Sequence, residues 1–226
     1  MPAALLVAPL VVGLLGVVTP AHAGVCDDPL FLTIEAPPPV DDRHGVATGT
    51  GTYSGKSMVG GRFSLESTHS PDVWRTVLLA ADTQDEWMPK RFGYELVENI
   101  DAEHMYLRFD IGFLANSVHV KRQIVVTSTS GMVGDRFRTC WRMTDPTPYL
   151  AQISHLVSPD IDWERTSTGW WEVTPTPSGG AIINYQWWAE TGKIPNVVLR
   201  YGLSNTLPDL LDAFDERVAS QSKGPR

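Results

Sequence analysis

Apolar and polar residues alternate along most of the middle of the chain. The clearest case runs from His104 to Ile111, where every second side chain is apolar, as in a strand with one buried face. Similar alternation marks the segments 61–68, 91–97, 118–126, 133–143, 169–174 and 181–188. Because the links between these segments are short, we expect an antiparallel meander of about seven strands.

Other stretches carry the period of a helix. A short helix is predicted from Ser70, with Pro71 in its first turn, and a second one covers 82–88. From 195 to 220, apolar residues recur every three or four positions, which predicts a long final helix with one face on the sheet. Pro208 lies inside this segment, and a proline removes one helix hydrogen bond, so we expect a kink or a two-part helix there.

The N-terminal segment has the character of a signal peptide. Residues 1–23 contain no charged side chain and end in Ala21-His22-Ala23, which has the small-x-small form of a secretory cleavage site. We therefore predict a signal peptide over 1–23 and an exported protein, either periplasmic or secreted. No Lys or Arg precedes the apolar run, which is atypical, and the run is close to the length that spans a bilayer. Membrane anchoring through an uncleaved N-terminal segment is therefore the alternative.

The rest of the chain divides by composition. Residues 24–57 are rich in Pro, Gly, Asp and Thr and lack helical periodicity, so we expect an extended N-terminal extension. One folded domain is predicted over 58–220, because the strand and helix patterns both fall within it. A disordered tail is expected at 221–226.

The chain has two cysteines, Cys26 and Cys140. In an exported protein, a disulfide between them is the expected state. Acylation of Cys26, as in a lipoprotein, is the alternative, although Val25 rather than Gly or Ala precedes it. The spacing of the two cysteines does not support a metal or redox site.

The formal net charge of −8 argues against nucleic acid as a partner. Basic residues nevertheless gather on the polar sides of the predicted strands, in a set that we call the basic stripe. Its members are Arg108, Lys121, Arg136, Arg138 and Arg142. The stripe either makes transient contact with an anionic membrane surface or is an ordinary solvated sheet face.

The sequence contains no motif that marks a reaction. It has no Gly-x-Ser-x-Gly, no His-Glu-x-x-His and no glycine-rich phosphate loop, and its histidines are scattered without metal-ligand spacing. We therefore single out no catalytic or metal-binding residue and expect no cofactor.

Several short motifs point to a family. They are Ser70-Pro71-Asp72-Val73-Trp74, Asp85-Glu86-Trp87-Met88-Pro89, Gly169-Trp170-Trp171-Glu172-Val173, Ile194-Pro195-Asn196 and Leu207-Pro208-Asp209-Leu210-Leu211. With the order of the predicted elements, they resemble the StAR-related lipid transfer (START) and polyketide cyclase superfamily, also called SRPBCC. The stretch Asn116-Ser117-Val118-His119 departs from the acidic element that members often carry there, so a function tied to those acids lacks support.

The resemblance implies an α+β helix-grip fold, in which a curved antiparallel sheet of about seven strands wraps around the long C-terminal helix. It also implies a cavity that binds lipids or other hydrophobic molecules. Candidate lining residues lie on the apolar rows of the strands and on the final helix. They are Leu107, Phe109, Val120, Trp141, Tyr185, Trp187, Val198 and Tyr201. The alternative is a packed core in which these side chains fill the space.

Arg122 lies in an otherwise apolar row. A buried guanidinium requires a partner, because an unpaired buried charge is costly. Arg122 is therefore either a polar anchor for a ligand or a structural residue. In the structural case it pairs with Asp135 or Glu172, or a bend of the strand turns it outward.

These patterns and the resemblance together favour an exported START-like protein that binds or carries a lipid or other hydrophobic small molecule. We expect a monomer without catalytic activity. A cyclase or dehydratase type of enzyme that acts on a hydrophobic substrate in the same cavity is the alternative. An interaction domain with a vestigial cavity is a third candidate.

Overall fold

The computed structural model describes residues 39–41, 45–53, 55–89, 92–113, 118–164, 166–190 and 195–222. The predicted signal peptide, Cys26 and residues 223–226 of the expected tail lie outside these ranges. Within them, none of the helices combines the length and the apolar character that crossing a bilayer requires.

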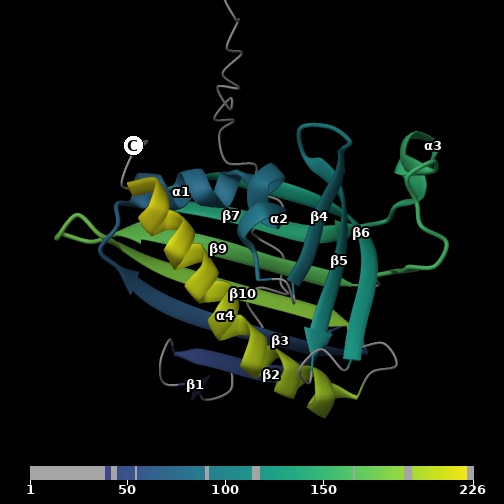
Figure 1. The fold of residues 1–226 in the computed structure, drawn as a ribbon, viewed down its shortest axis with the longest axis horizontal. Coiled ribbons are helices and arrows are strands. Elements are labelled where there is room, and N and C mark those ends of the chain that lie inside the picture. The colour runs from purple at the N-terminus through teal and green to yellow at the C-terminus, as the bar shows by residue number, and fades with distance from the viewer. Residues whose placement is uncertain are drawn as a thin grey trace, which may run out of the picture.

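A curved sheet forms the body of the molecule (Figure 1). Its strands are β1 (Pro39–Asp41), β2 (Val46–Tyr53), β3 (Lys56–Ser67), β4 (Phe92–Asn99), β5 (His104–Phe113), β6 (Val118–Val133), β7 (Arg136–Thr144), β8 (Asp162–Trp163), β9 (Ser167–Pro175) and β10 (Ala181–Glu190). In the described part of the chain, nine strands pair antiparallel in the order β1-β2-β3-β10-β9-β7-β6-β5-β4, and β8 pairs parallel with β6.

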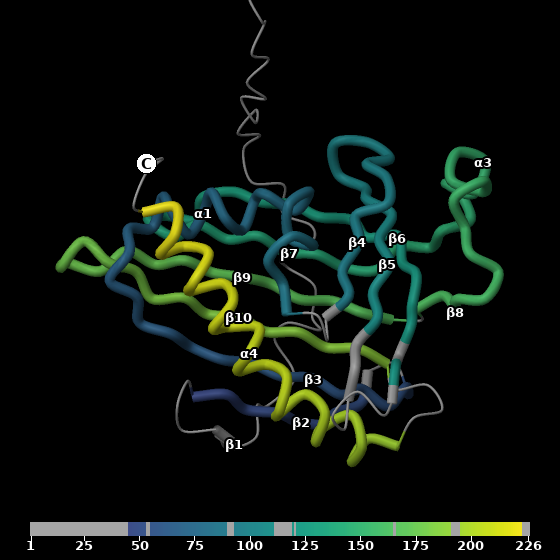
Figure 2. The backbone as a smooth tube through the Cα atoms, in the orientation of Figure 1, coloured from purple at the N-terminus to yellow at the C-terminus, as the bar shows by residue number. Residues whose placement is uncertain are grey.

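One long helix crosses the concave face of this sheet. The helices are α1 (Pro71–Leu79), η2 (Ala81–Thr83), α2 (Gln84–Trp87), η3 (Thr147–Tyr149), α3 (Leu150–Ile153) and α4 (Asn196–Ser222). Helix α4 contacts β2 and β3, and its C-terminal end lies beside α1 (Figures 1 and 2). The α+β class and the sheet wrapped around a C-terminal helix are therefore confirmed.

The sheet extends further than the alternation predicts. Strands β1 and β2 lie within the expected N-terminal extension, so the sheet begins before the predicted domain boundary at Met58. Strand β2 is built largely of alternating Thr and Gly, which leaves no apolar row for a pattern search to detect. Strand β6 continues to Val133, and Gly134 makes the turn into β7 with a φ of 67°.

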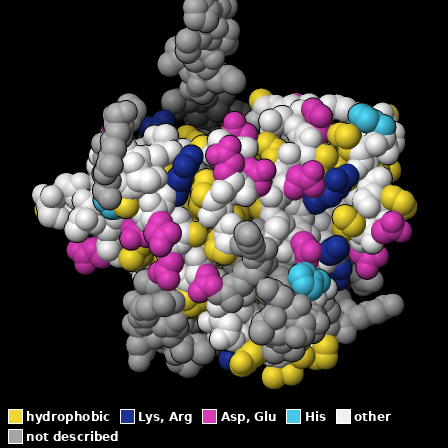
Figure 3. Space-filling model, in the orientation of Figure 1, with side chains coloured by type: hydrophobic (Ala, Val, Ile, Leu, Met, Phe, Trp, Pro, Cys, Tyr) yellow, Lys and Arg dark blue, Asp and Glu magenta, His cyan; other side chains and the backbone are white. Residues whose placement is uncertain are grey.

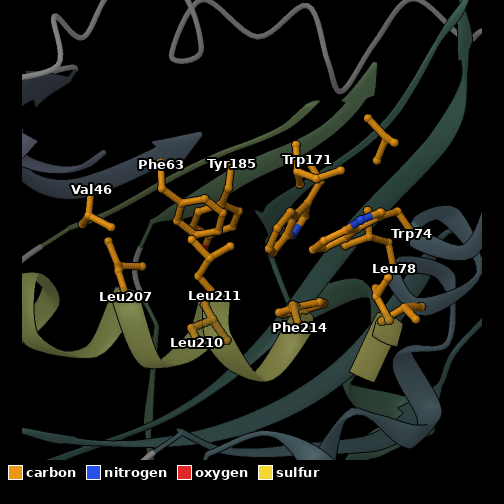
Figure 4. Packing of buried hydrophobic residues seen from close by; sticks show 14 of the residues in the cluster. Val46, Phe63, Trp74, Leu78, Trp171, Tyr185, Leu207, Leu210, Leu211 and Phe214 are labelled. Carbon is orange, nitrogen blue, oxygen red and sulfur yellow. The ribbon is translucent and has the colours of Figure 1, made fainter. Parts of the chain in front are cut away.

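The main core lies between α4 and the middle of the sheet. Figure 4 shows Phe63, Trp171 and Tyr185 pointing from the strands toward Leu211 and Phe214 of α4. Burial of each such side chain stabilises the fold by about 1.5–3 kcal/mol. These apolar contacts hold α4 against the concave face of the sheet.

The expected break of α4 at Pro208 is not observed. The helix runs as one element through the proline (Figure 1), and the Thr206 hydroxyl donates to the Gly202 carbonyl at 2.9 Å. Leu203 before the proline and Phe214 after it are both buried. Because both halves pack on the same sheet, the loss of one helix hydrogen bond does not split them.

A connection of the chain covers the outer face of β4, β5 and β6. Ile153 of α3 packs with Tyr106 and Val125 in a small core of its own. The side chain of Gln123 is fully buried beneath this connection. Its amide nitrogen donates to the carbonyl oxygens of Ser158 at 3.0 Å and Ile161 at 2.6 Å, which holds the connection against the sheet.

Candidate cavity for a hydrophobic ligand

A cavity of about 240 Å³ lies between the concave face of the sheet and the helices. Strands β4, β5, β6, β7, β9 and β10 supply its walls, and residues of α1, η2, α2 and α4 border it on the other side. Most side chains that line it are aliphatic or aromatic, and none of the described lining residues is charged. The polar lining residues are Gln84, Tyr94, Ser128, Thr139, Ser167 and Tyr185.

Strand register explains why the predicted residues meet at this cavity. Directly paired residues point to the same face, and Leu107 pairs with Ile124 while Trp141 pairs with Gly169. The structure places part of the predicted set in the cavity wall. These residues are Leu107, Phe109, Trp141, Tyr185 and Trp187. The Trp187 indole nitrogen donates to Ser167 Oγ at 2.9 Å, which fixes the ring at one end of the wall.

Gly169 makes room for one of these side chains. A Cβ atom at this position would lie 2.6 Å from Cζ2 of Trp141 and 2.8 Å from the Gln186 carbonyl oxygen. Real Cβ atoms essentially never show contacts this short, so only glycine lets the Trp141 ring approach the strand this closely. The shape of this wall therefore depends on a residue without a side chain.

Two predicted lining residues lie elsewhere. Tyr201 is 57 % exposed, and Val198 is half-buried, but neither borders the cavity. The face of α4 that borders the cavity carries Leu203 and Leu207, and Tyr201 is rotated by about 200° from Leu203 around the helix. The side chain of Val120 lies outside the described part of the structure.

Arg122 does not reach the cavity lining. Its Nη1 donates to the Lys121 carbonyl at 2.7 Å, and its Nε lies 3.8 Å from Oε2 of Glu164. Asp162 Oδ2 lies 3.9 Å from Nη1 of the same guanidinium. Arg122 is therefore paired as expected for a structural residue, but with acids that the parallel pairing of β8 and β6 brings close rather than with Asp135 or Glu172.

The sequence interpretation missed several lining residues. Ser128 and Thr139 are polar residues that share a row with apolar neighbours, as Arg122 does, and this could have marked them. Gln84 and Tyr94 close the end of the cavity near α2, where the approach of helix to strand is a tertiary contact. No local pattern reports such an approach.

Two tyrosines, Tyr94 and Tyr185, are among the residues that line the cavity. Tyr185 is only 8 % exposed, and its ring stacks on Phe63 with 4.9 Å between centroids and on Trp171 with 4.4 Å. Burial raises the pKa of the Tyr185 phenol. The pKa of the Tyr94 phenol is also raised, mainly by burial and to a smaller extent by the negative charges of Asp85 and Asp82. Both side chains therefore stay protonated over the physiological range and act as neutral donors.

Acidic side chains lie outside the cavity at its α2 end. Asp82, Asp85 and Glu86 are all exposed on η2 and α2. Figure 3 shows acidic side chains gathered over these short helices, next to apolar side chains. The described surface of η2 and α2 beside this end of the cavity therefore carries negative charge.

Much of the basic stripe is paired with acids. Arg138 Nη2 lies 2.5 Å and Arg136 Nη1 3.6 Å from the Glu172 carboxylate, and Lys121 Nζ lies 3.8 Å from Asp110. Arg108 pairs with Glu95 at 3.4 Å. Such pairing reduces the positive field that would attract an anionic membrane.

The described residues offer no group of three or more His, Cys, Asp or Glu side chains that could hold a metal ion. His104 pairs with Asp101 at 2.8 Å, and His119 pairs with Asp110 at 2.8 Å. Both histidines are thus engaged at the surface, away from the lining of the cavity.

Three solved structures share this architecture. A STAR-related lipid transfer protein from Xanthomonas axonopodis superimposes with a TM-score of 0.61 at 20% identity, over 80% of this chain and 97% of its own. Human StAR-related lipid transfer protein 5 superimposes with a TM-score of 0.63 at 10% identity, over 87% of this chain and 93% of its own. Human STARD10 superimposes with a TM-score of 0.56 at 12% identity, over 81% of this chain and 73% of its own. The fold is the helix-grip fold of START proteins. At these identities the likeness establishes the START fold alone. At the level of sequence, no family model and no curated protein matches the chain.

Proposed function

We propose that the protein binds or carries a lipid or other hydrophobic small molecule in the cavity between the sheet and α4. The observation that carries this proposal is the partly open cavity of about 240 Å³ with a mostly apolar, uncharged described lining. Ligand sites are typically concave, mostly apolar and provided with a few polar groups that orient the ligand. Two of the three solved structures, from Xanthomonas axonopodis and human, are named as StAR-related lipid transfer proteins, which agrees with this proposal.

A carrier has more support than an enzyme. General acid–base catalysis usually relies on carboxylate, imidazole or amine side chains, and the described lining contains none of them. Among the described lining residues, the cyclase or dehydratase alternative has only the phenols of Tyr94 and Tyr185 as candidate acids or bases. Their raised pKa values make them poor bases at neutral pH.

Native mass spectrometry of the purified protein, with solvent extraction of the sample, tests the proposal. A stoichiometric apolar adduct is expected, either as purified or after incubation with a lipid extract. A Thr139→Phe variant places a large ring in the wall and should lose the adduct, since Thr139 borders the cavity and pairs with Trp171. Ile182→Phe, at a position that is 38 % exposed and outside the lining, is the matched control and should keep it. A mass that stays free of ligand in every sample argues against the proposal.

We also propose that the protein is exported and acts in the periplasm or outside the cell. Support comes from the uncharged segment 1–23 with its Ala21-His22-Ala23 ending. The intact mass of the protein recovered from a bacterial periplasmic fraction checks this: a chain that begins at Gly24 is expected. A chain that keeps its first residues and stays in the membrane fraction would favour the anchored alternative.

A further inference from the structure

The described lining of the cavity offers no positive partner to a negatively charged ligand. None of its described lining residues is charged, and the guanidinium of Arg122 is committed to Glu164 and Asp162 outside the lining. A carboxylate that leaves water for such a site loses its hydration without gaining an ion pair. The described walls therefore disfavour an anion and tolerate an uncharged molecule.

The described lining of the cavity contains a hydrogen-bond donor without a partner. The Tyr185 side chain borders the cavity, is 8 % exposed, and has no hydrogen-bond partner among the described residues. Its ring is held by Phe63 and Trp171 at centroid distances of 4.9 and 4.4 Å, so its direction is set before any ligand enters. Because this hydroxyl has no partner among the described residues, it is available to donate to an oxygen atom of a ligand, and such a hydrogen bond contributes about 0.5–1.5 kcal/mol.

We infer that the cavity selects an uncharged ligand whose oxygen atom accepts a hydrogen bond from the Tyr185 hydroxyl, and that it rejects carboxylates. This inference rests on the proposed function and narrows the ligand class for the same site. Esters, ketones and alcohols with an apolar body meet both conditions. A free fatty acid is uncharged, and so meets the first condition, only in its protonated form.

The acidic surface beside the cavity acts in the same direction. Asp82 and Asp85 lie on η2 and α2, whose neighbours Ala81 and Gln84 border the cavity. Two like charges near the α2 end raise the energy of an approaching anion, and salt screens this effect. The walls thus set the equilibrium preference, while the rim adds a smaller and salt-dependent contribution.

Matched ligand pairs test the inference. Methyl dodecanoate against dodecanoate, and methyl naphthoate against naphthoate, compare an ester with an ion on the same apolar body. Titration is followed by tryptophan fluorescence, because Trp141, Trp171 and Trp187 line the cavity. At pH ~8 the acids are ionised, and each ester should bind at least ~10-fold more tightly than its acid. Equal affinity for ester and acid would overturn the inference and leave the proposed function intact, whereas binding of neither, together with the absence of any adduct, would overturn the proposed function.

Tyr185→Phe tests the donor. The variant keeps the stacked ring and removes only the hydroxyl, so methyl naphthoate should bind about 3- to 10-fold more weakly while naphthalene, which has no acceptor, binds as before. An equal loss for both probes would mean that the ring matters only for shape and would overturn the assignment of the donor.

Asp82→Asn combined with Asp85→Asn tests the rim. Dodecanoate should bind about 2- to 5-fold more tightly at low salt, and methyl dodecanoate should be unaffected. Asp160→Asn, an exposed carboxylate on the connection after α3, is the control and should change neither affinity. An unchanged acid affinity in the double variant would remove the rim from the inference.

Discussion

Arg122 and Glu164 pair across the junction of β6 and the segment after β8, with 3.8 Å between Nε and Oε2. The Arg122 side chain is 22 % exposed and that of Glu164 8 %. We predict that Arg122→Leu lowers the free energy of unfolding by about 1–2 kcal/mol, because it leaves a largely buried carboxylate with one partner fewer. Affinity for a cavity ligand should stay within about twofold of the parent.

Chemical denaturation and fluorescence titration of the same preparation check both parts. A loss of ligand affinity at unchanged unfolding free energy would instead make Arg122 an anchor of the ligand. Arg122→Lys keeps the charge and serves as the control, since it should retain most of the stability.

Gln123 is the residue on which the outer connection depends. Its side-chain oxygen accepts from the Tyr106 hydroxyl at 2.6 Å and from the Ser158 amide at 3.2 Å. Gln123→Leu should lower the free energy of unfolding by about 2–4 kcal/mol, because it leaves several buried polar groups unpaired. Tyr106→Phe removes one partner only and should cost about 1 kcal/mol. Hydrogen exchange over 147–161 should accelerate in Gln123→Leu, and unchanged protection there would contradict this role.

Gly169→Ala should distort the cavity wall. The added methyl group would meet both the Trp141 ring and the Gln186 carbonyl oxygen at less than 3 Å, so the indole or the strand must shift. We expect a loss of about 1–3 kcal/mol in unfolding free energy and weaker ligand binding. Gly131→Ala is the matched control: it is also a strand glycine, and nothing lies within 4 Å of its added methyl group. Similar losses in the two variants would show that strand propensity rather than the Trp141 contact is responsible.

Local sequence patterns predict some of the lining residues and miss contacts that depend on the tertiary fold. Alternation placed Leu107, Phe109 and Trp141 on one face, and the register of neighbouring strands does the rest. The prediction that Tyr201 lines the cavity is wrong, because a helical period identifies the apolar stripe of a helix but not the part of it that lies over a cavity. The partners of Arg122 lie in β8 and directly after it, at the end of a long connection. Local sequence patterns do not predict the pairing of so short a strand with β6.

The buried phenol of Tyr185 predicts a loss of stability at high pH. Burial raises its pKa above that of the unfolded chain, so the folded state holds the proton more tightly. Its contribution is therefore fully present below pH ~10 and is lost as pH rises above that value, by up to about 1.4 kcal/mol per pH unit. Denaturation midpoints measured from pH ~9 to ~11 should fall less steeply in Tyr185→Phe than in the parent. Tyr201→Phe, at an exposed position, should fall like the parent, and an identical slope in all three proteins would contradict the prediction.

The pairing of Cys26 with Cys140 is the last prediction. Cys140 is fully buried on the face of β7 opposite to that of Trp141, so a disulfide would hold the N-terminal extension against the outer side of the sheet. Closing a loop of this length stabilises the fold by about 4–5 kcal/mol in the chain-entropy model.

Peptide mapping without reduction should recover the two cysteines in one linked fragment. Cys26→Ala removes the crosslink alone, whereas Cys140→Ala also removes a buried side chain, so the second variant should be the less stable of the two. Added reductant should bring the parent to the stability of Cys26→Ala. Two free thiols in protein recovered from an oxidising compartment, or a lipid mass on Cys26, would show that the extension is held in another way.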